Sequence, residues 1–283
     1  MADSNRGRRR QPRPLASDRR TDTRGRFHLL WDLVFTGLRS LGVRANSFYA
    51  TVGVFLVIGV VIAIAGTLAF AEVGEWVQKG VTQSFDVAVL EWMHRHQTKL
   101  LTQAAVELTY LGTGTVVLMI VAVAALFLWH TRHKHSARLL LAAVAGNIVL
   151  NGVLKFVFHR DRPTVFEWQT TAVSSSFPSG HAMSATVCYG TVAYLVIRLQ
   201  KHRWSRVLTG TAAVILILLI CTTRLYLGVH YPSDVIAGIL VGLAWAGFCM
   251  ATLEASLVIA RRRAPRTVVE ERRAPTESAT TTA

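Results

Sequence analysis

The chain has 283 residues, of which 52% are hydrophobic and only 17% are charged, and its mean hydropathy is +0.38. This apolar content excludes a chain that is disordered throughout, and the charged fraction lies below the roughly 25% typical of soluble domains. The net charge of +15 does not indicate a nucleic-acid-binding protein, because basic residues gather at both ends and membrane-length apolar runs separate the others.

Both ends of the chain are polar and basic. Residues 1–26 are rich in Arg, Asp and Ser, a composition typical of a disordered tail, and residues 261–283 are of the same kind. Apolar residues recur at helical spacing over residues 27–44, which predicts an amphipathic helix on the membrane surface. We therefore predict a basic cytoplasmic tail with an amphipathic segment at 1–47, a membrane domain at 48–260 and a disordered cytoplasmic tail from residue 261.

A helix needs about 20 apolar residues to cross the bilayer core. Six stretches meet this requirement, at about 48–71, 111–130, 137–158, 180–198, 207–227 and 234–258. Between the first two, residues 84–107 carry apolar side chains among polar ones, which favours an interfacial helix over an ordinary loop. In the last stretch, Gly238 and Gly242 lie one helical turn apart and favour close helix packing. The predicted fold class is all-α, a polytopic membrane protein with six transmembrane helices.

The distribution of basic residues predicts the orientation in the membrane. With both ends of the chain in the cytoplasm, 24 of the 31 Lys and Arg residues lie on the cytoplasmic side. Cytoplasmic segments of membrane proteins carry an excess of Lys and Arg, so this orientation is favoured. It places the connection at 159–180 on the extracytoplasmic side. The compact six-span form is typical of a bacterial envelope protein, and we expect it in the bacterial cell membrane.

Ionisable side chains at the ends of spans are costly and are therefore candidates for function. Under the predicted topology, six of them lie at the same, extracytoplasmic end: Lys155, Arg162, His181, Arg224, His230 and Asp234. Three fixed cations suit a phosphate, which presents several anionic oxygens. Two histidines beside them could supply a nucleophile and a general acid. Asp234, four residues after His230, could bind one ring nitrogen and fix the tautomer.

The segment Phe177-Pro178-Ser179-Gly180-His181 opens the fourth predicted span. Backbone N–H groups and the positive end of that helix would face the same anion, and Gly180 would allow the backbone to approach it closely. Arg160 and Asp161 lie in the preceding connection. We interpret these two residues as a local pair within a loop, outside the site.

These residues form three motifs that resemble the signature of the type 2 phosphatidic acid phosphatase family of lipid phosphatases. The family pattern is K-x6-RP, PSGH and SR-x5-H-x3-D. The chain reads Lys155-FVFHRD-Arg162-Pro163, Pro178-Ser179-Gly180-His181 and Thr223-Arg224-LYLGV-His230-YPS-Asp234. The one departure is Thr223, where the family usually has serine, and threonine keeps the hydroxyl group. The motifs span residues 155–234, and six spans around them fit the family's membrane architecture.

The resemblance implies a role for each motif residue. His230 would be the nucleophile that forms a phosphohistidine, Asp234 would orient it, and His181 would protonate the leaving lipid oxygen. The phosphoryl oxygens would be held by Lys155, Arg162, Ser179, Gly180 through its backbone N–H, and Arg224. We expect no metal and no cofactor, because the cations take the part that a metal would play in stabilising the transferred charge.

The expected function is hydrolysis of a phospho- or diphospho-lipid. Phosphatidic acid, phosphatidylglycerol phosphate and polyprenyl diphosphates are substrates in the family that the chain resembles. The expected partners are the lipid substrate and the bilayer, with no nucleic acid, and the sequence does not indicate an oligomeric state. A phosphotransferase that passes the group from His230 to an acceptor lipid would carry the same motifs. A non-enzymatic lipid binder or transporter would have degenerate motifs, whereas these are complete.

Overall fold

The computed structural model describes residues 48–172 and 174–263, and within these ranges every regular element is a helix. The long helices are α2 (Phe48–Gln78), α5 (Gly114–His130), α6 (Lys134–Val157), α7 (Gly180–Leu199), α8 (Arg203–Tyr226) and α9 (Pro232–Arg263). The short ones are α3 (Gln83–Arg95), α4 (Lys99–Thr109) and the 3-10 helix η1 (Tyr110–Gly112). The all-α prediction is confirmed. The segment predicted at 1–47 lies outside the described residues, and so does the tail predicted at 261–283 except for residues 261–263, which continue α9.

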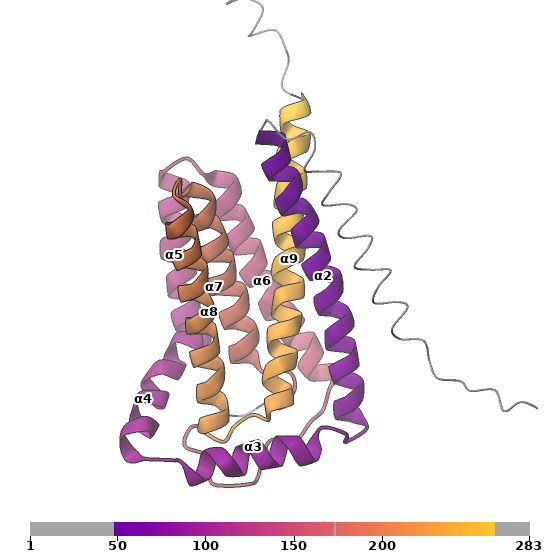
Figure 1. Ribbon diagram of the computed structural model, residues 1–283, viewed down its shortest axis with the longest axis vertical. Coiled ribbons are helices and arrows are strands. Elements are labelled where there is room, and N and C mark those ends of the chain that lie inside the picture. The colour runs from indigo at the N-terminus through magenta and orange to yellow at the C-terminus, as the bar shows by residue number, and fades with distance from the viewer. Residues whose placement is uncertain (1–47, 173, 264–283) are drawn as a thin grey trace, which may run out of the picture. The chain divides into compact units, whose positions relative to one another are not determined.

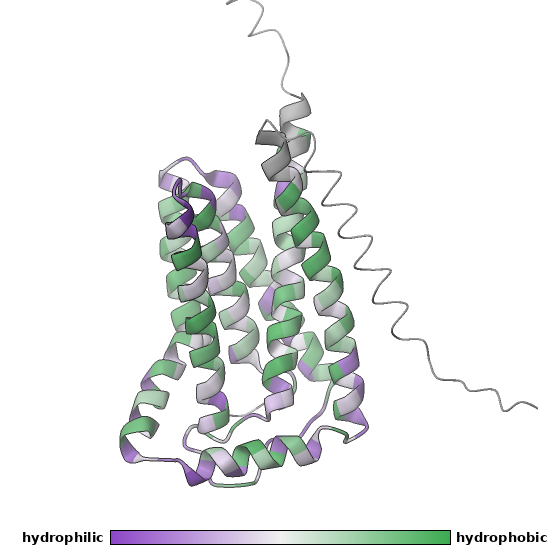
Figure 2. Cartoon of the chain, in the orientation of Figure 1, coloured by the Kyte–Doolittle hydropathy of each residue, from purple (hydrophilic) through white to green (hydrophobic). Residues whose placement is uncertain are grey.

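The long helices account for the predicted membrane spans. Five are long and apolar enough to cross a bilayer, namely Leu56–Gln78 of α2, α6, α7, α8 and Pro232–Leu257 of α9. Helix α5 counts as a sixth only together with α4 and η1, as one span bent by 50°. Hydrophobic residues predominate along these helices and polar residues toward their ends (Figure 2), and many large hydrophobic side chains on them are exposed, such as Leu68, Leu126 and Val153. Such apolar faces are what a bilayer would cover.

Small residues allow the helices to pack closely. A Cβ atom on Gly59 of α2 would lie 2.8 Å from the carbonyl oxygen of Gly247 on α9, so only glycine fits there. A Cβ on Gly238 would lie 2.6 Å from the carbonyl oxygen of Ser179, and one on Gly242 would lie 2.9 Å from Cβ of Thr186. The close packing predicted for Gly238 and Gly242 is thus confirmed, and its partner is α7. Packing through small residues is the usual mode of helix association in membranes.

The region predicted as one helix at 84–107 is two helices. Helix α3 lies across one end of the bundle (Figure 1) and contacts α8 and α9, while α4 turns back along α8. The Thr98 side chain accepts a hydrogen bond from the Leu101 N–H at 3.3 Å and so begins α4 as its N-cap. Tyr226 fixes the break, because its hydroxyl accepts from the Thr98 N–H at 2.9 Å and its carbonyl accepts from Gln97 Nε2 at 2.7 Å.

Candidate active site

Four helix ends and two connections bring the predicted site residues to one end of the bundle. Lys155 lies in the last turn of α6 and Arg224 in the last turn of α8. His181 and Asp234 lie in the first turns of α7 and α9, which run the opposite way. Since the ends of α6 and α8 therefore meet the starts of α7 and α9, residues far apart in sequence share one face. This is the end that α3 crosses (Figure 1).

His230 and Asp234 form a buried pair. Their exposed fractions are 2% and 0%, and Nδ1 of His230 lies 3.6 Å from Oδ2 of Asp234. On the other side of the ring, Nη1 of Arg162 lies 3.4 Å from Nε2. Because arginine can only donate, Nε2 must accept, which places the ring proton on Nδ1. The Nε2 lone pair is therefore directed toward a cation rather than toward Asp234.

The protonation of His230 follows from its burial. Burial lowers its pKa to about 4, although the contact with Asp234 acts to raise it. At neutral pH the imidazole is therefore neutral, as a nitrogen nucleophile must be. Burial also lowers the pKa of Arg162, while Asp234 opposes this change. An arginine remains charged after such a shift, so Arg162 stays a cation beside Nε2.

Lys155 and Arg162 are held by the same residue of the 158–179 connection. The Lys155 ammonium donates to Oγ of Ser174 at 2.7 Å, and Nε of Arg162 donates to the Ser174 carbonyl at 2.9 Å. Arg162 also donates to the Val229 carbonyl at 2.7 Å, next to the nucleophile candidate. Neutral acceptors thus position both cations without cancelling their charge.

Arg224 is the most buried of the three cations, with an exposed fraction of 3%. Its Nη1 donates to Oγ1 of Thr109 on α4 at 2.7 Å, and its Nε has no hydrogen-bond partner among the described residues. Within the same part of the chain, no carboxylate lies at salt-bridge distance from Lys155, Arg162 or Arg224. A buried charge without an ionic partner is costly. The arrangement therefore favours an anionic ligand that binds all three cations.

His181 lies within electrostatic range of the other site residues, namely Arg224, His230, Lys155 and Arg162. It is half-buried. Gly112 of η1 packs against its ring, because a Cβ there would lie 3.0 Å from Cδ2 of His181. Ser179 is fully buried, and its Oγ accepts from the Ala182 N–H at 3.5 Å as the N-cap of α7. The Ser179 N–H donates to the Asp234 carbonyl at 3.0 Å and so ties α7 to α9.

Two further motif positions have structural explanations. A Cβ on Gly180 would lie 3.3 Å from Oδ1 of Asn151, so the missing side chain lets α7 approach α6 closely. The hydroxyl of Thr223 donates to the Ile220 carbonyl at 2.6 Å, within its own helix. A serine could make the same bond. The replacement at position 223 therefore keeps the local hydrogen bonding of α8.

Arg160 is not part of a local loop pair, and that interpretation is wrong. Its Nη1 lies 2.5 Å from Oδ1 of Asp234, and its Nη2 lies 2.9 Å from Oδ2 of Asp86 on α3. Asp161 is exposed and forms no ion pair within the described ranges. Burial acts to lower the pKa of Arg160, but Asp234 and Asp86 outweigh it and raise this pKa. The partners lie 74 residues away in each direction, where local sequence gives no indication of them.

Asp86 also lies at the end of the bundle that holds the site residues, and the sequence analysis did not identify it. It is fully buried, as is Leu90, one turn further along α3. A carboxylate at that spacing on the apolar side of an interfacial helix is the signal that could have indicated it.

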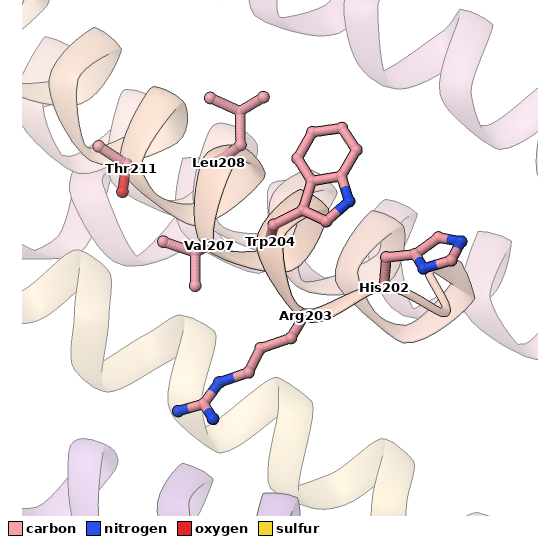
Figure 3. Close-up of a pocket in the computed structure, with 6 residues that line it drawn as sticks. All are labelled: His202, Arg203, Trp204, Val207, Leu208 and Thr211. Carbon is pink, nitrogen blue, oxygen red and sulfur yellow. The ribbon is translucent and has the colours of Figure 1, made fainter.

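One open hollow on the described surface lies away from these residues. Figure 3 shows it at the start of α8, where it is lined by His202, Arg203, Trp204, Val207, Leu208 and Thr211. This is the opposite end of α8 from Arg224, and none of the predicted site residues lines it. Among the described residues, no group of three or more His, Cys, Asp or Glu side chains is placed to hold a metal ion.

Comparison with known proteins gives consistent results. Residues 136–257 match the PAP2 superfamily. Phosphatidylglycerophosphatase B of Bacillus subtilis is 30% identical over 172 residues, which cover 59% of this chain and 82% of the relative. The undecaprenyl-diphosphatase of Sulfolobus acidocaldarius is 31% identical over 177 residues, covering 61% of this chain and 80% of the relative.

A solved structure has a similar fold. It is the crystal structure of a transmembrane PAP2-type phosphatidylglycerolphosphate phosphatase from Bacillus subtilis, with a TM-score of 0.63 and 25% sequence identity. The similarity covers 72% of this chain and 98% of that one. The helical fold and these relatives define an integral membrane phosphatase that hydrolyses lipid phosphates. The chain belongs to the PAP2 superfamily, which confirms the resemblance found in its motifs.

Proposed function

We propose that the protein hydrolyses a membrane lipid phosphate without a metal, through a phosphohistidine on His230, with phosphatidylglycerol phosphate, phosphatidic acid and a polyprenyl diphosphate as the candidate substrates. One observation carries the proposal. Three cations at one end of the bundle have no carboxylate at salt-bridge distance among the described residues, and Nε2 of His230 faces one of them. A phosphoryl group would supply the missing negative charge and the electrophile together.

The first step would form the phosphoenzyme. Nε2 of His230 attacks phosphorus, and the bond between phosphorus and the lipid oxygen breaks. His181, which is protonated once the anionic phosphate is bound beside it, gives its proton to that oxygen, so the lipid leaves as an alcohol or as the shorter phosphate. Asp234 stabilises the positive charge that develops on the ring of His230. The three cations stabilise the charge on the transferred oxygens, with help from Ser179 and the backbone N–H of Gly180.

The second step would reverse these roles. His181 takes a proton from water, and the water oxygen attacks phosphorus. The bond between phosphorus and Nε2 breaks, inorganic phosphate leaves, and His230 regains its lone pair. The charge stabilisation comes from fixed arginine and lysine side chains in both steps, so the reaction requires no divalent metal.

We place the site on the extracytoplasmic side of a bacterial cell membrane, with both termini in the cytoplasm. This placement rests on the topology predicted from the sequence, in which 24 of the 31 Lys and Arg residues lie on the cytoplasmic side. The lipid chains would stay in the bilayer while the phosphate enters the end of the bundle at the interface. The names of the relatives, a phosphatidylglycerophosphatase and an undecaprenyl-diphosphatase, support a lipid phosphate as the substrate.

The test is phosphate release by the purified full-length protein in lipid micelles with excess EDTA. Each candidate lipid is offered alone, with no acceptor lipid, so release identifies a hydrolase rather than a phosphotransferase. His230→Ala should show no release, while His159→Ala, a change at an exposed histidine of the same end, should keep it. Full activity of His230→Ala or a requirement for metal would overturn the proposal. A folded wild-type protein that releases phosphate from none of the lipids would also overturn it.

A further inference from the structure

Helix α3 carries one carboxylate into the end of the bundle. Asp86 is fully buried. Its Oδ1 accepts from the Ser233 N–H at 3.0 Å, and its Oδ2 accepts from Oγ of Ser233 at 2.5 Å and from Nη2 of Arg160 at 2.9 Å. Ser233 lies in the first turn of α9, beside Asp234. Asp86 precedes the residues that match the PAP2 superfamily, which begin at 136.

Arg160 connects this carboxylate to the one beside His230. One end of its guanidinium binds Asp86, and Nη1 binds Oδ1 of Asp234 at 2.5 Å and Oγ of Ser233 at 2.8 Å. The flat face of the guanidinium lies 4.2 Å from the centre of the Tyr231 ring. A planar guanidinium held at both ends and on one face has a single orientation. Arg160 is therefore a rigid link between α3 and α9.

The two oxygens of Asp234 have different partners because of this link. Oδ1 is occupied by Arg160, while Oδ2 accepts from the Tyr231 N–H at 2.9 Å and from the Ser176 hydroxyl. Only Oδ2 faces Nδ1 of His230. Rotation of the carboxylate would break the ion pair with Arg160 and move Oδ2 away from the imidazole.

We propose that Asp86 and Arg160 are positioning residues for the nucleophile. They fix the carboxylate of Asp234, which in turn holds the proton on Nδ1 of His230 and leaves the Nε2 lone pair directed at the phosphoryl site. This inference rests on the proposed role of His230. It adds to the site a residue of α3 and a residue of the 158–179 connection, which bind neither substrate nor phosphate.

The charge balance explains why both residues are needed. Asp86 and Asp234 are buried carboxylates, and Arg160 is the cation between them. Without Arg160 the two carboxylates would repel each other with no cation between them. Without Asp86 the guanidinium loses one of its two anchors, and Ser233 loses the acceptor for its N–H.

The network could instead serve only to attach α3 to the bundle, and the two roles give different results. We would compare Asp86→Asn, Arg160→Gln and Arg160→Lys in the full-length protein in micelles. Glu91→Gln is the matched control, an exposed carboxylate on the same helix. For each variant, kcat and KM are measured together with thermal unfolding, so that rates refer to folded protein.

If Asp86 and Arg160 position the nucleophile, their replacement should lower kcat with little change in KM. Removing the group that orients a catalytic or metal-binding histidine costs roughly 10- to 100-fold or more. We expect a loss in that range for Arg160→Gln and for Asp86→Asn, and none for Glu91→Gln. Arg160→Lys keeps the charge but cannot bridge two carboxylates, so it should lose kcat as well.

The acid limb of the pH profile is the pH range in which kcat/KM falls because His230 becomes protonated. Its position would not change if Asp86 and Arg160 had a purely structural role. The groups that face His230 are Asp234 of α9, Arg162 of the 158–179 connection, Arg224 of α8 and His181 of α7. Removing the Arg160 cation strengthens the field of Asp234, so the limb should move to higher pH. Removing the Asp86 charge should move it to lower pH, and Arg160→Lys should leave it in place.

The outcomes separate this inference from the proposed function. Wild-type kcat and an unmoved acid limb in folded Asp86→Asn and Arg160→Gln, while His230→Ala is inactive, would overturn the positioning roles alone. Lower unfolding temperatures with unchanged kcat would do the same, because they would identify an anchor for α3. Full activity of His230→Ala would overturn the proposed function first. Lower kcat with limb shifts of opposite sign in the two charge variants would establish the inference.

Discussion

Each end of the bundle holds an arginine in the last turn of a helix, partly exposed at Arg198 and buried at Arg224, and the two have different partners. Arg198 of α7 lies 3.0 Å from Oε1 of Glu254, which is fully buried and also accepts from the Tyr194 hydroxyl. Arg224 of α8, at the other end, binds only the neutral Thr109 among the described residues, and its Nε has no partner there. A neutralised arginine joins α7 to α9, whereas an arginine without a counter-charge is available to an anion.

This difference shows that an arginine at a helix end is a candidate for anion binding only where no carboxylate of the protein neutralises it. Both arginines are costly to place in a membrane domain. The cost at Arg198 is offset within the protein by Glu254, so its role is structural. At Arg224 the offset must come from a ligand. The following predictions test this contrast, in order of decreasing effect.

Among the changes that test this contrast, replacing Arg224 should reduce activity most. Arg224→Met removes a cation from the phosphoryl site, and the loss of one such electrostatic group costs roughly 10²- to 10³-fold in kcat. The folded state should lose no stability through an ion pair, because Arg224 has no carboxylate partner in the described chain. Steady-state kinetics and thermal unfolding in the same micelles test both statements. A variant that keeps wild-type kcat would remove Arg224 from the site.

Replacing Arg198 should have the reverse effect. Arg198→Met leaves Glu254 buried without its cation, and breaking a buried pair in this way costs about 3–5 kcal/mol. We expect a lower unfolding temperature, with near wild-type kcat in the protein that remains folded. The double variant Arg198→Met with Glu254→Gln should recover much of the stability. Loss of kcat in fully folded Arg198→Met would show that the two ends do not have separate roles.

Vanadate, a phosphate analogue, should stabilise the folded protein. A ligand that binds only the folded state at 100 times its Kd adds about 2.7 kcal/mol. The unfolding temperature of the wild type should therefore rise with vanadate, and that of Arg198→Met should rise equally. Arg224→Met should respond weakly, because it lacks a binding cation. An equal response in Arg224→Met would place the anion elsewhere.

Widening the contact between α7 and α9 should cost about 1–3 kcal/mol. In Gly238→Ala the new Cβ would lie 2.6 Å from the Ser179 carbonyl oxygen, and backbone cannot yield easily. The change also displaces the start of α7, so activity should fall with stability. Gly152→Ala is the matched control, because nothing lies within 4 Å of a Cβ at that site. Equal stability of the two variants would contradict the close packing.

A change of pH near neutrality should have the smallest effect on activity and stability. The pKa of His230 is lowered by burial to about 4, from an ordinary value of about 6.5. Protonated His230 cannot attack, so kcat/KM should fall as the pH drops through about 4. Since the unfolded chain binds this proton first, the stability that His230 contributes is complete above about pH 6.5 and declines toward pH 4. An acid limb centred near pH 6.5 would indicate an exposed imidazole.

The sequence predicts the all-α class and eight candidate site residues, because these depend on local patterns. Membrane-length apolar runs identify spans from composition alone, and fixed spacings such as that between His230 and Asp234 identify the motifs. The break at Thr98 is less visible, because Tyr226, which holds it, lies 128 residues away. Local pattern therefore overestimates the length of the interfacial helix.

The missed residues are those whose role depends on tertiary packing. Arg160 lies inside the first motif, beside Asp161, and adjacent opposite charges favour a local pair. The structure instead pairs it with Asp86 and Asp234, which only the crossing of α3 over α9 brings together. Glu254 is a similar case, since its ion pair with Arg198 requires α7 to pack against α9.

The most direct test of the account is to trap the phosphoenzyme. The protein is mixed with lipid labelled in its terminal phosphate and quenched with alkali within one turnover, because a phosphohistidine survives alkali and is lost in acid. The account predicts an alkali-stable, acid-labile label on the wild type and on His159→Ala, and none on His230→Ala. A label that persists in His230→Ala, or turnover by the wild type with no label at any quench time, would contradict it.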